Sequence, residues 1–494
     1  MPSTTTGSGG GRHSISTHPG SSRKGRTRRC EHPGPSRPGT DRRVGRLVGP
    51  FPGACAPDPV QTATKAVAIL PLANLRNCRW PAERTFTTLV RSSLDHNGNP
   101  DFRNGQVRCT SMDAEQYADT PYGEVRRVPG RDYLAYYPRP LPDSVDLPRD
   151  TVQLLADAEA ALGRLAGVGH LLPDPHLLIR PYLLREALAS TRIEGTRASL
   201  VGVLEAEAGG EALGLDVEEV VNYVKAMEQG LALLEELPFS LRLVREMHAI
   251  LLDGVRGRDR RPGEIRTTQN WIGAPGATIT TASFVPPPPE ELGPLLTDWE
   301  RFVHENRTIP VLVQSGLIHY QFETIHPFLD GNGRLGRLVI VFHLVLRERL
   351  PSPLLYLSPY FEQRREDYYV RLQAVRERGD LDGWIRFYLR GVEIQANDAV
   401  ARAERLVDLR ESYRARVMES TRSQAVALVD LLFAHPILTA RLVEADVDVR
   451  RPTALRMLDQ LVDLGILHEM EPGPRRQRRF IAPEVIAVLG EDNE

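Results

Sequence analysis

The stretch HPFLDGNGRLGR occupies residues 326–337 and joins two apolar segments, 311–325 and 332–348, whose spacing is typical of helices. Gly331 and Gly333 allow the backbone to approach a phosphate closely. Their N–H groups and that of Asn332 lie where the second helix begins, and the N-terminal end of a helix favours negative charge. We therefore predict an anion-binding loop between two packed helices.

The polar side chains of this loop suit a nucleotide site. Arg334 and Arg337 are three residues apart, so both can point toward the same anion. Asp330 provides a carboxylate of the kind that Mg²⁺ uses alongside phosphate oxygens. His326 is the one side chain of the loop whose ordinary pKa suits proton abstraction at neutral pH. We expect His326 to act as a general base.

Three other motifs are rejected. Gly331–Gly336 also fits GxGxxG, but that dinucleotide fingerprint follows a strand, whereas a helix is predicted here. The spacing of His319, His326 and His343 does not match a helical ligand pair, so His319 and His343 are expected to be packed helix residues. A P-loop would need a lysine, and Lys225 is the only lysine after residue 65.

Outward from the loop, apolar residues recur every three or four positions and predict a mostly α fold. Ser240 is a candidate N-cap for one of these helices. Two β-rich runs, 268–272 and 277–285, are separated by glycines and a proline and predict a β-hairpin that ends at Pro286–Pro289. The predicted helices begin near residue 147 and near 240, and otherwise cover 176–192, 216–236, 290–305, 311–325, 332–348, 362–378 and 380–420.

The C-terminal part has another rhythm, with short helices at about 423–434, 438–444 and 451–464 and a basic strand pair near 475–480. This order suggests a small winged helix-turn-helix domain. Arginines around the expected recognition helix and in the expected wing would favour DNA, while interspersed aspartates would repel phosphates, so binding to DNA and docking to protein both stay open. The arginines are Arg441, Arg450, Arg451, Arg456 and the run 475–479, and the aspartates are Asp446, Asp448 and Asp459.

The composition excludes several classes of protein. The formal net charge of -2 lacks the basic bias of a protein that coats nucleic acid or membrane. Neither a membrane span nor a secretory signal is recognisable, which predicts a cytoplasmic protein without membrane contact. Residues 1–111 hold all four cysteines without metal-type spacing and show little apolar periodicity. We expect this part to be disordered, or an over-extended reading frame upstream of Met112.

The loop resembles, at every fixed position, the signature of the Fic family, His-Pro-Phe-x-Asp-Gly-Asn-Gly-Arg-x-x-Arg, and the similarity extends over about residues 130–400. The resemblance implies a protein adenylyltransferase that moves AMP from ATP to a Ser, Thr or Tyr hydroxyl of a protein, with Mg²⁺. It implies that His326 is the base and Asp330 the metal ligand, and that Phe328 anchors the loop. The implied ATP and phosphate contacts are Gly331, Asn332, Gly333, Arg334, Gly336, Arg337 and, for adenine, Tyr368.

A second segment, Ser190–Gly195, resembles the inhibitory motif of the same family. Ser190 and Glu194 are four apart and share one helix face. In the family the glutamate pairs with the second arginine of the loop, here Arg337, so the resemblance implies autoinhibition by Glu194 with Ser190. A carboxylate that competes with phosphate for one guanidinium is electrostatically sound.

The expected fold is therefore a Fic-type helical core with a β-hairpin flap that docks the target, plus the winged-helix domain. The expected parts are 1–111, an N-terminal helical region with the inhibitory motif at 112–235, a catalytic core at 236–400, and a linker helix with the winged helix at 401–494. The expected partners are ATP and a protein hydroxyl, which can belong to the chain itself. A homodimer and DNA contact through the C-terminal domain stay open. The alternative function is a DNA-binding transcriptional regulator with a winged helix, in which the Fic domain serves mainly for binding or autoregulation.

Overall fold

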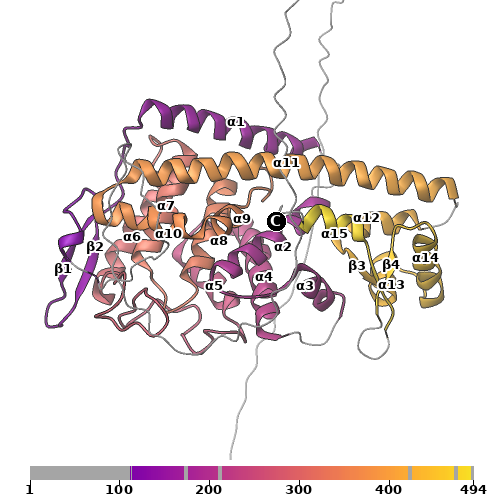
Figure 1. Cartoon of the computed structure of the whole chain (residues 1–494), viewed down its shortest axis with the longest axis horizontal. Helices are drawn as coiled ribbons and strands as arrows, with labels where there is room; N and C mark the ends of the chain where they lie inside the picture. Colours follow the sequence, from indigo (N-terminus) through magenta and orange to yellow (C-terminus); the bar gives the residue numbers. More distant parts are fainter. Residues whose placement is uncertain are drawn as a thin grey trace, which may run out of the picture. The chain divides into compact units, whose positions relative to one another are not determined.

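The computed structural model describes residues 112, 114–171, 176–209, 214–420, 425–471 and 477–490, all within one compact unit. The predictions for residues 1–111 lie outside this part of the chain. Helices dominate the described residues, as the apolar periodicity predicted (Figure 1). The strands form two small sheets.

The centre of the core is α7 (Val311–Ile325), in which every residue after Val311 is buried. It is covered by α8 (Asn332–Leu346) and by α6 (Leu292–Glu305), which follows the short η2 (Pro289–Glu291). On the other side of α8 lie α4 (Gly214–Glu236) and α5 (Leu241–Leu251). Ser240 accepts a hydrogen bond from the backbone of Leu243 and caps α5, as predicted.

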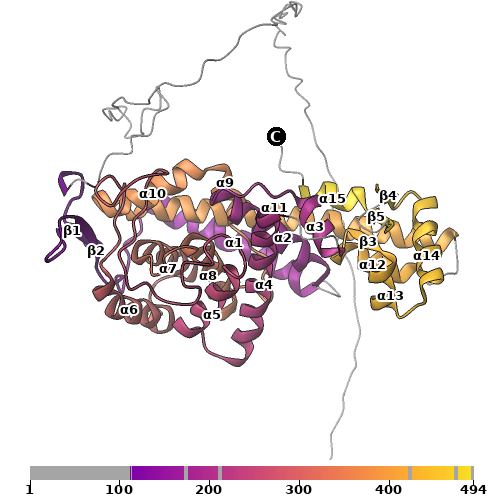
Figure 2. The same ribbon diagram turned by 90° about the horizontal axis from the view of Figure 1, so that it is seen from below.

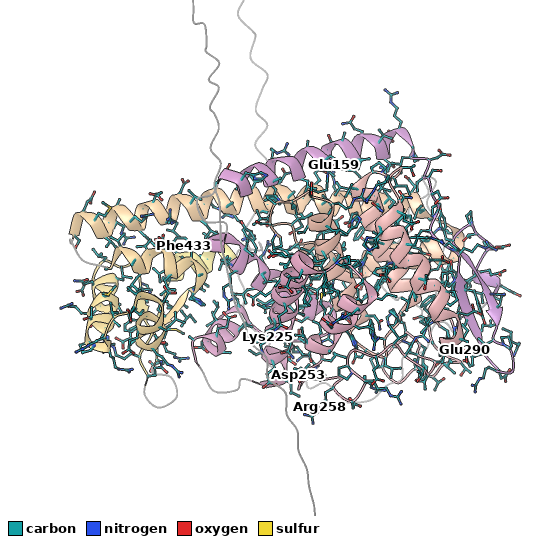
Figure 3. The ribbon with its side chains drawn as sticks, turned by 180° about the vertical axis from the view of Figure 1, so that it is seen from behind. Glu159, Lys225, Asp253, Arg258, Glu290 and Phe433 are labelled. Atoms are coloured by element: carbon teal, nitrogen blue, oxygen red, sulfur yellow. The ribbon has the colours of Figure 1, made fainter. Side chains whose placement is uncertain are left out.

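Two long helices run side by side along this core, α1 (Arg149–Leu171) and α11 (Leu381–Ser420) (Figures 1 and 2). The predicted helix 380–420 is confirmed. The expected division at residue 400 falls inside α11, which continues without a break. An ion pair between Glu159 of α1 and Arg349 ties α1 to the segment after α8 (Figure 3).

The helix α2 (His176–Ile193) contains Ser190, but Glu194 follows it in a turn, so the two residues do not share one helix as expected. It contacts α4 and also α9 (Ser358–Gln363), which is followed by α10 (Arg365–Arg378). The single helix predicted at 362–378 is thus two helices, and α9 begins earlier than expected. A further helix, α3 (Leu200–Glu207), was not predicted; Ser199 caps it by accepting the Gly202 N–H.

The predicted flap hairpin is wrong in detail, because its two runs meet only at one bridge, Ile272 to Phe284. The Thr278 to Thr281 turn bonds to itself instead. The backbone after this turn bonds to a segment far upstream, since Tyr136 N–H donates to the carbonyl of Val285. Tyr136 belongs to a hairpin that the sequence analysis missed, which follows η1 (Ala114–Gln116) and consists of β1 (Gly123–Arg127) and β2 (Leu134–Pro138).

The C-terminal region alternates helices and short strands, and its sheet has the order β3-β5-β4. This order of elements is compatible with the expected winged helix-turn-helix. The last helix, at Pro483–Gly490, was not predicted. No helix among the described residues has the length and apolar character needed to span a bilayer. The elements are α12 (Val426–Ala434), β3 (Ile437–Thr439), α13 (Ala440–Val447), α14 (Arg451–Asp463), β4 (His468–Glu469), β5 (Arg479–Ile481) and α15 (Pro483–Gly490).

Candidate active site

His326 ends α7 and starts the loop. Its backbone is left-handed, with φ 49° and ψ 62°, so the chain turns sharply at this residue. Only 17% of the side chain is exposed, and Nδ1 has no hydrogen-bond partner. Burial, reinforced by Arg266 and Arg376, lowers the pKa of His326 to about 3. The imidazole is therefore neutral at pH 7, the form that can accept a proton.

The loop is held by side chains that the sequence analysis did not single out. Arg266 Nε donates to the carbonyl of His326 at 2.9 Å, and Arg266 also donates to the carbonyls of Ile325 and Pro287. Asn270 donates to the carbonyl of Phe328 at 2.8 Å. These residues lie sixty positions upstream, so spacing in sequence gave no sign of the contact.

Phe328 and Asn332 fasten the loop from within. Phe328 is fully buried, as predicted for an anchor. The amide of Asn332 accepts from Phe328 N–H and donates to Phe328 C=O, both at 2.9 Å. The side chain of Asn332 is therefore engaged in bracing the loop. A contact of Asn332 with the transferred phosphate stays a prediction.

His248 of α5 supports the loop from below. Its ring stacks on Phe328 with centroids 3.8 Å apart, and its Nε2 lies 2.9 Å from the carbonyl oxygen of Asp330. Its Nδ1 accepts the N–H of Gly263 at 2.8 Å. Burial lowers the pKa of His248 to about 4, so this ring is also neutral at pH 7.

The glycines of the loop have two different jobs. Gly331 has φ 78° and is the N-cap residue of α8. Gly333 has no side chain, and Glu194 occupies the space that a Cβ there would fill. Gly336 faces α7 instead. A Cβ there would lie 2.6 Å from Glu323 Oε1 and 3.2 Å from Phe322. The expected phosphate contact at Gly336 is therefore corrected to a close approach of α8 and α7.

Asp330 and Arg334 lie together at the start of α8. The Asp330 side chain is 44% exposed, and its Oδ1 lies 3.6 Å from Arg334. Arg334 is 4% exposed and also lies 3.4 Å from Glu219 of α4, a buried carboxylate that sequence reasoning missed. Glu219 in turn pairs with Arg256. An exposed carboxylate beside a fixed guanidinium can hold a cation that carries phosphate.

Arg337 contacts the segment Ser190–Gly195. Its Nε donates to Ser190 Oγ at 2.8 Å, and its terminal nitrogen donates to the Ser190 carbonyl at 2.9 Å and to Glu194 Oε1 at 2.7 Å. The pairing of Arg337 with Glu194 is the one that the resemblance to the family's inhibitory motif implied. Burial opposes the charge on Glu194, but Arg337 outweighs it and lowers the pKa of Glu194. The carboxylate is thus ionised where a phosphate would bind.

Tyr368, the expected adenine contact, is 1% exposed and lies in the core. Its ring stacks on Phe361 at 4.7 Å and its hydroxyl pairs with His319 at 2.8 Å. In this structure it has no face to offer a base, which corrects the prediction. His319 and His343 are both fully buried, as expected for packed helix residues. The neighbouring Tyr369 is 42% exposed.

Two family models match the chain. Residues 152–232 match the family described as Fic/DOC family N-terminal, and residues 238–344 match the Fic/DOC family. The first match contains Ser190 and Glu194, and the second contains the loop from His326 to Arg337. The two contacting segments thus lie within the residues that match these two family models.

Curated relatives and solved structures are similar to parts of the chain. Protein adenylyltransferase Fic of Drosophila grimshawi is 29% identical over 251 residues, which is 49% of this chain and 46% of the relative. The same-named protein of Drosophila yakuba is 30% identical over 206 residues, 40% of this chain and 36% of the relative. The chain spans about half the length of the Drosophila grimshawi relative and about a third of the Drosophila yakuba relative. A Fic family protein of Desulfovibrio desulfuricans has a TM-score of 0.46 and 22% identity, over 68% of this chain and 97% of its own.

Proposed function

We propose that this chain, with its Fic/DOC family domains, transfers AMP from ATP to a serine, threonine or tyrosine hydroxyl of a protein. The observation that carries the proposal is the meeting of His326, Asp330, Arg334 and Arg337 at one end of α8, opposite a carboxylate already bound to Arg337. The name of the Drosophila relatives, protein adenylyltransferase, agrees with this chemistry.

In the proposed reaction the target oxygen forms a bond to the α-phosphorus, and the bond from that phosphorus to the pyrophosphate oxygen breaks. The neutral imidazole of His326 takes the proton of the hydroxyl. Arg266 and Asn270 hold the carbonyl side of His326 and keep the ring at the end of α7. Arg334 and Arg337 bind the departing phosphates, where charge develops as the bond breaks.

Asp330 fits one ligand position of a nucleotide-bound Mg²⁺. Its carboxylate is exposed, it is a hard oxygen ligand, and the adjacent guanidinium of Arg334 suits phosphate. Among the described residues no cluster of three His, Cys, Asp or Glu could hold a metal. A single carboxylate is the arrangement expected when the nucleotide supplies most of the ligands. When bound, Mg²⁺ would neutralise phosphate charge.

We also propose that the described state is restrained. Glu194 holds Arg337 and covers the open face of Gly333, so the outer phosphates of ATP would have to displace it. ATP that binds beside Glu194 would lack one phosphate contact and the in-line geometry that transfer requires. Release of Glu194 would then activate the chain.

The test is incorporation of radiolabel from ATP with Mg²⁺. Label on the α-phosphate should enter protein, and label on the γ-phosphate should not. The variant His326→Ala should lose about a hundredfold or more of this transfer, the typical contribution of a general base, while it still binds ATP. Transfer that survives in His326→Ala, or entry of the γ-label, would contradict the proposed reaction.

A second candidate function is DNA binding by the C-terminal region, which the order of its elements favours. Arg441, Arg450 and Arg456 are exposed and available to phosphates. The described part of the expected basic wing is less available. Arg478 pairs with Asp459 and Glu469, and Arg479 pairs with Glu205. Salt-dependent retention on immobilised DNA tests this function separately from AMP transfer.

A further inference from the structure

His248 belongs to α5, 82 residues before Asp330, yet it contacts the loop through its ring face and through one nitrogen. The ring lies almost parallel to Phe328, at 15° and 3.8 Å, and Nε2 lies 2.9 Å from Asp330 C=O. A Cβ on Gly331 would lie 3.4 Å from the same Nε2. The imidazole therefore lies directly beneath the two residues that precede α8.

The second ring nitrogen fixes the hydrogen pattern of the first. The N–H of Gly263 points at Nδ1, so Nδ1 is an acceptor and carries no proton. The proton of the neutral ring is then on Nε2, which donates to the carbonyl of Asp330. His248 of α5 thus accepts a hydrogen bond from the segment at Gly263 and donates one to the loop. Asp253 and Arg258, in the segment between α5 and Gly263, are exposed (Figure 3).

We propose that His248 is a positioning residue that sets the direction of the Asp330 carboxylate toward the metal bound with the nucleotide. The carbonyl of Asp330 accepts a hydrogen bond from His248, and its side-chain Oδ1 accepts one from Gly331 N–H at 2.6 Å. With these contacts made, and with Arg334 3.6 Å from the same Oδ1, the carboxylate has little freedom to turn. Groups that orient a metal ligand typically change metal affinity or activity about 10- to 100-fold when removed.

This inference rests on the proposed function, because the direction of Asp330 matters only if it binds a metal with the nucleotide. The role can be separated from simple packing by two substitutions. His248→Gln places an amide nitrogen near the position of Nε2 and can still donate to Asp330 C=O. His248→Asn places an oxygen near Nδ1, so it can satisfy Gly263 but leaves Asp330 C=O without its donor. A matched control is His304→Asn, because His304 Nε2 also lies within 2.6 Å of a backbone carbonyl, that of Phe239, outside the catalytic loop.

The variants are compared in the full chain carrying Glu194→Gly, with AMP transfer followed as Mg²⁺ is titrated. Binding of Mn²⁺ is measured in parallel from the electron paramagnetic resonance of the free ion, with a non-hydrolysable ATP analogue present. We expect His248→Asn to need about tenfold or more metal in both measurements. His248→Gln should stay within about threefold of the parent, and His304→Asn should match the parent.

Equal metal requirements in the Asn variant and the parent would overturn the inference. Equal losses in the Asn and Gln variants, with an unchanged metal requirement, would also overturn it and leave His248 a packing residue. If the Glu194→Gly parent itself transfers no AMP, the proposed function fails, while the Mn²⁺ measurement still decides whether His248 orients a metal ligand.

Discussion

Arg337 is a buried guanidinium that donates from Nε and one terminal nitrogen to Ser190 of α2 and to Glu194 just after it. It is 2% exposed and makes hydrogen bonds to Ser190 Oγ, Ser190 C=O and Glu194 Oε1. Burial alone would lower the pKa of Arg337, but Glu194 raises it, so the pair is mutually stabilising. Because 34% of the Glu194 side chain is exposed, water can replace its contact more easily than that of Ser190. We therefore regard Glu194 as the removable partner.

The residue-scale prediction is that Glu194→Gly raises AMP transfer, including transfer onto the chain itself. A hydrogen bond between charged groups is worth about 1.5–3 kcal/mol, so its loss should raise the rate by roughly ten- to a hundredfold. Glu194→Gln should act in the same direction, since it keeps the shape and removes the charge. The measurement is the initial rate of α-labelled AMP incorporation.

Arg337 provides the control for this prediction. In Glu194→Gly with Arg337→Ala the gain should vanish, because the released guanidinium no longer exists. A Glu194→Gly rate that equals the unmodified rate on every substrate would show that Glu194 does not restrain the site.

At the scale of elements, the helices that line the site were predictable because their apolar residues repeat with one clear period. α7 and α11 were predicted within about a residue. The flap was not, because β-rich composition at 268–285 does not say whether strands pair with each other or with β2. Contacts that join distant segments, such as Arg266 and His248 with the loop, leave no local signal. The Glu194 pairing was accessible only through the resemblance of its motif.

Gly230 shows how closely these helices are packed. It lies on α4, and a Cβ there would meet Met247 Sδ of α5 and Phe342 Cζ of α8, both at 2.6 Å. We predict that Gly230→Ala lowers the free energy of unfolding by about 1–3 kcal/mol, because the added methyl group forces two well-packed side chains to move. Chemical denaturation followed by tryptophan fluorescence measures this loss.

Gly163 on α1 is the matched comparison, since nothing lies within 4 Å of its added Cβ. Gly163→Ala should stabilise the chain by about 0.5–1 kcal/mol through helix propensity alone. If the two alanine variants changed stability in the same direction, packing at Gly230 would not be the deciding factor.

At the scale of the whole described chain, α2 links the catalytic core to the C-terminal region. One end of α2 carries Ser190 and leads to Glu194, while α12 and α15 pack against the same helix. Arg479 of β5 also pairs with Glu205 of α3 at 2.9 Å. α2 therefore contacts both the helical core and the C-terminal region, which the sequence assigned to separate parts of the chain.

The last prediction concerns the buried histidines of the core and acid stability. Burial lowers the pKa of His319, His326 and His343 to about 3 and that of His248 to about 4. In the unfolded chain a histidine titrates near 6.5. Below pH 6.5 these histidines therefore bind protons in the unfolded chain but stay neutral in the folded chain, until the pH falls to their pKa in the folded state. Stability is present above about pH 6.5 and is lost as the pH falls toward 3–4.

His343 isolates this effect, because neither of its ring nitrogens has a hydrogen-bond partner and it lies in the last turn of α8, away from the loop. Each proton that only the unfolded chain binds lowers the free energy of unfolding by about 1.4 kcal/mol per pH unit. His343 alone should therefore remove about 2 kcal/mol of stability between pH 7 and pH 5. His343→Leu deletes that contribution. Its denaturation midpoint should fall less steeply than that of the unmodified chain over this range, while AMP transfer at pH 7.5 stays the same. Parallel pH profiles for the two chains would show that His343 is protonated, or reached by water, in the folded core.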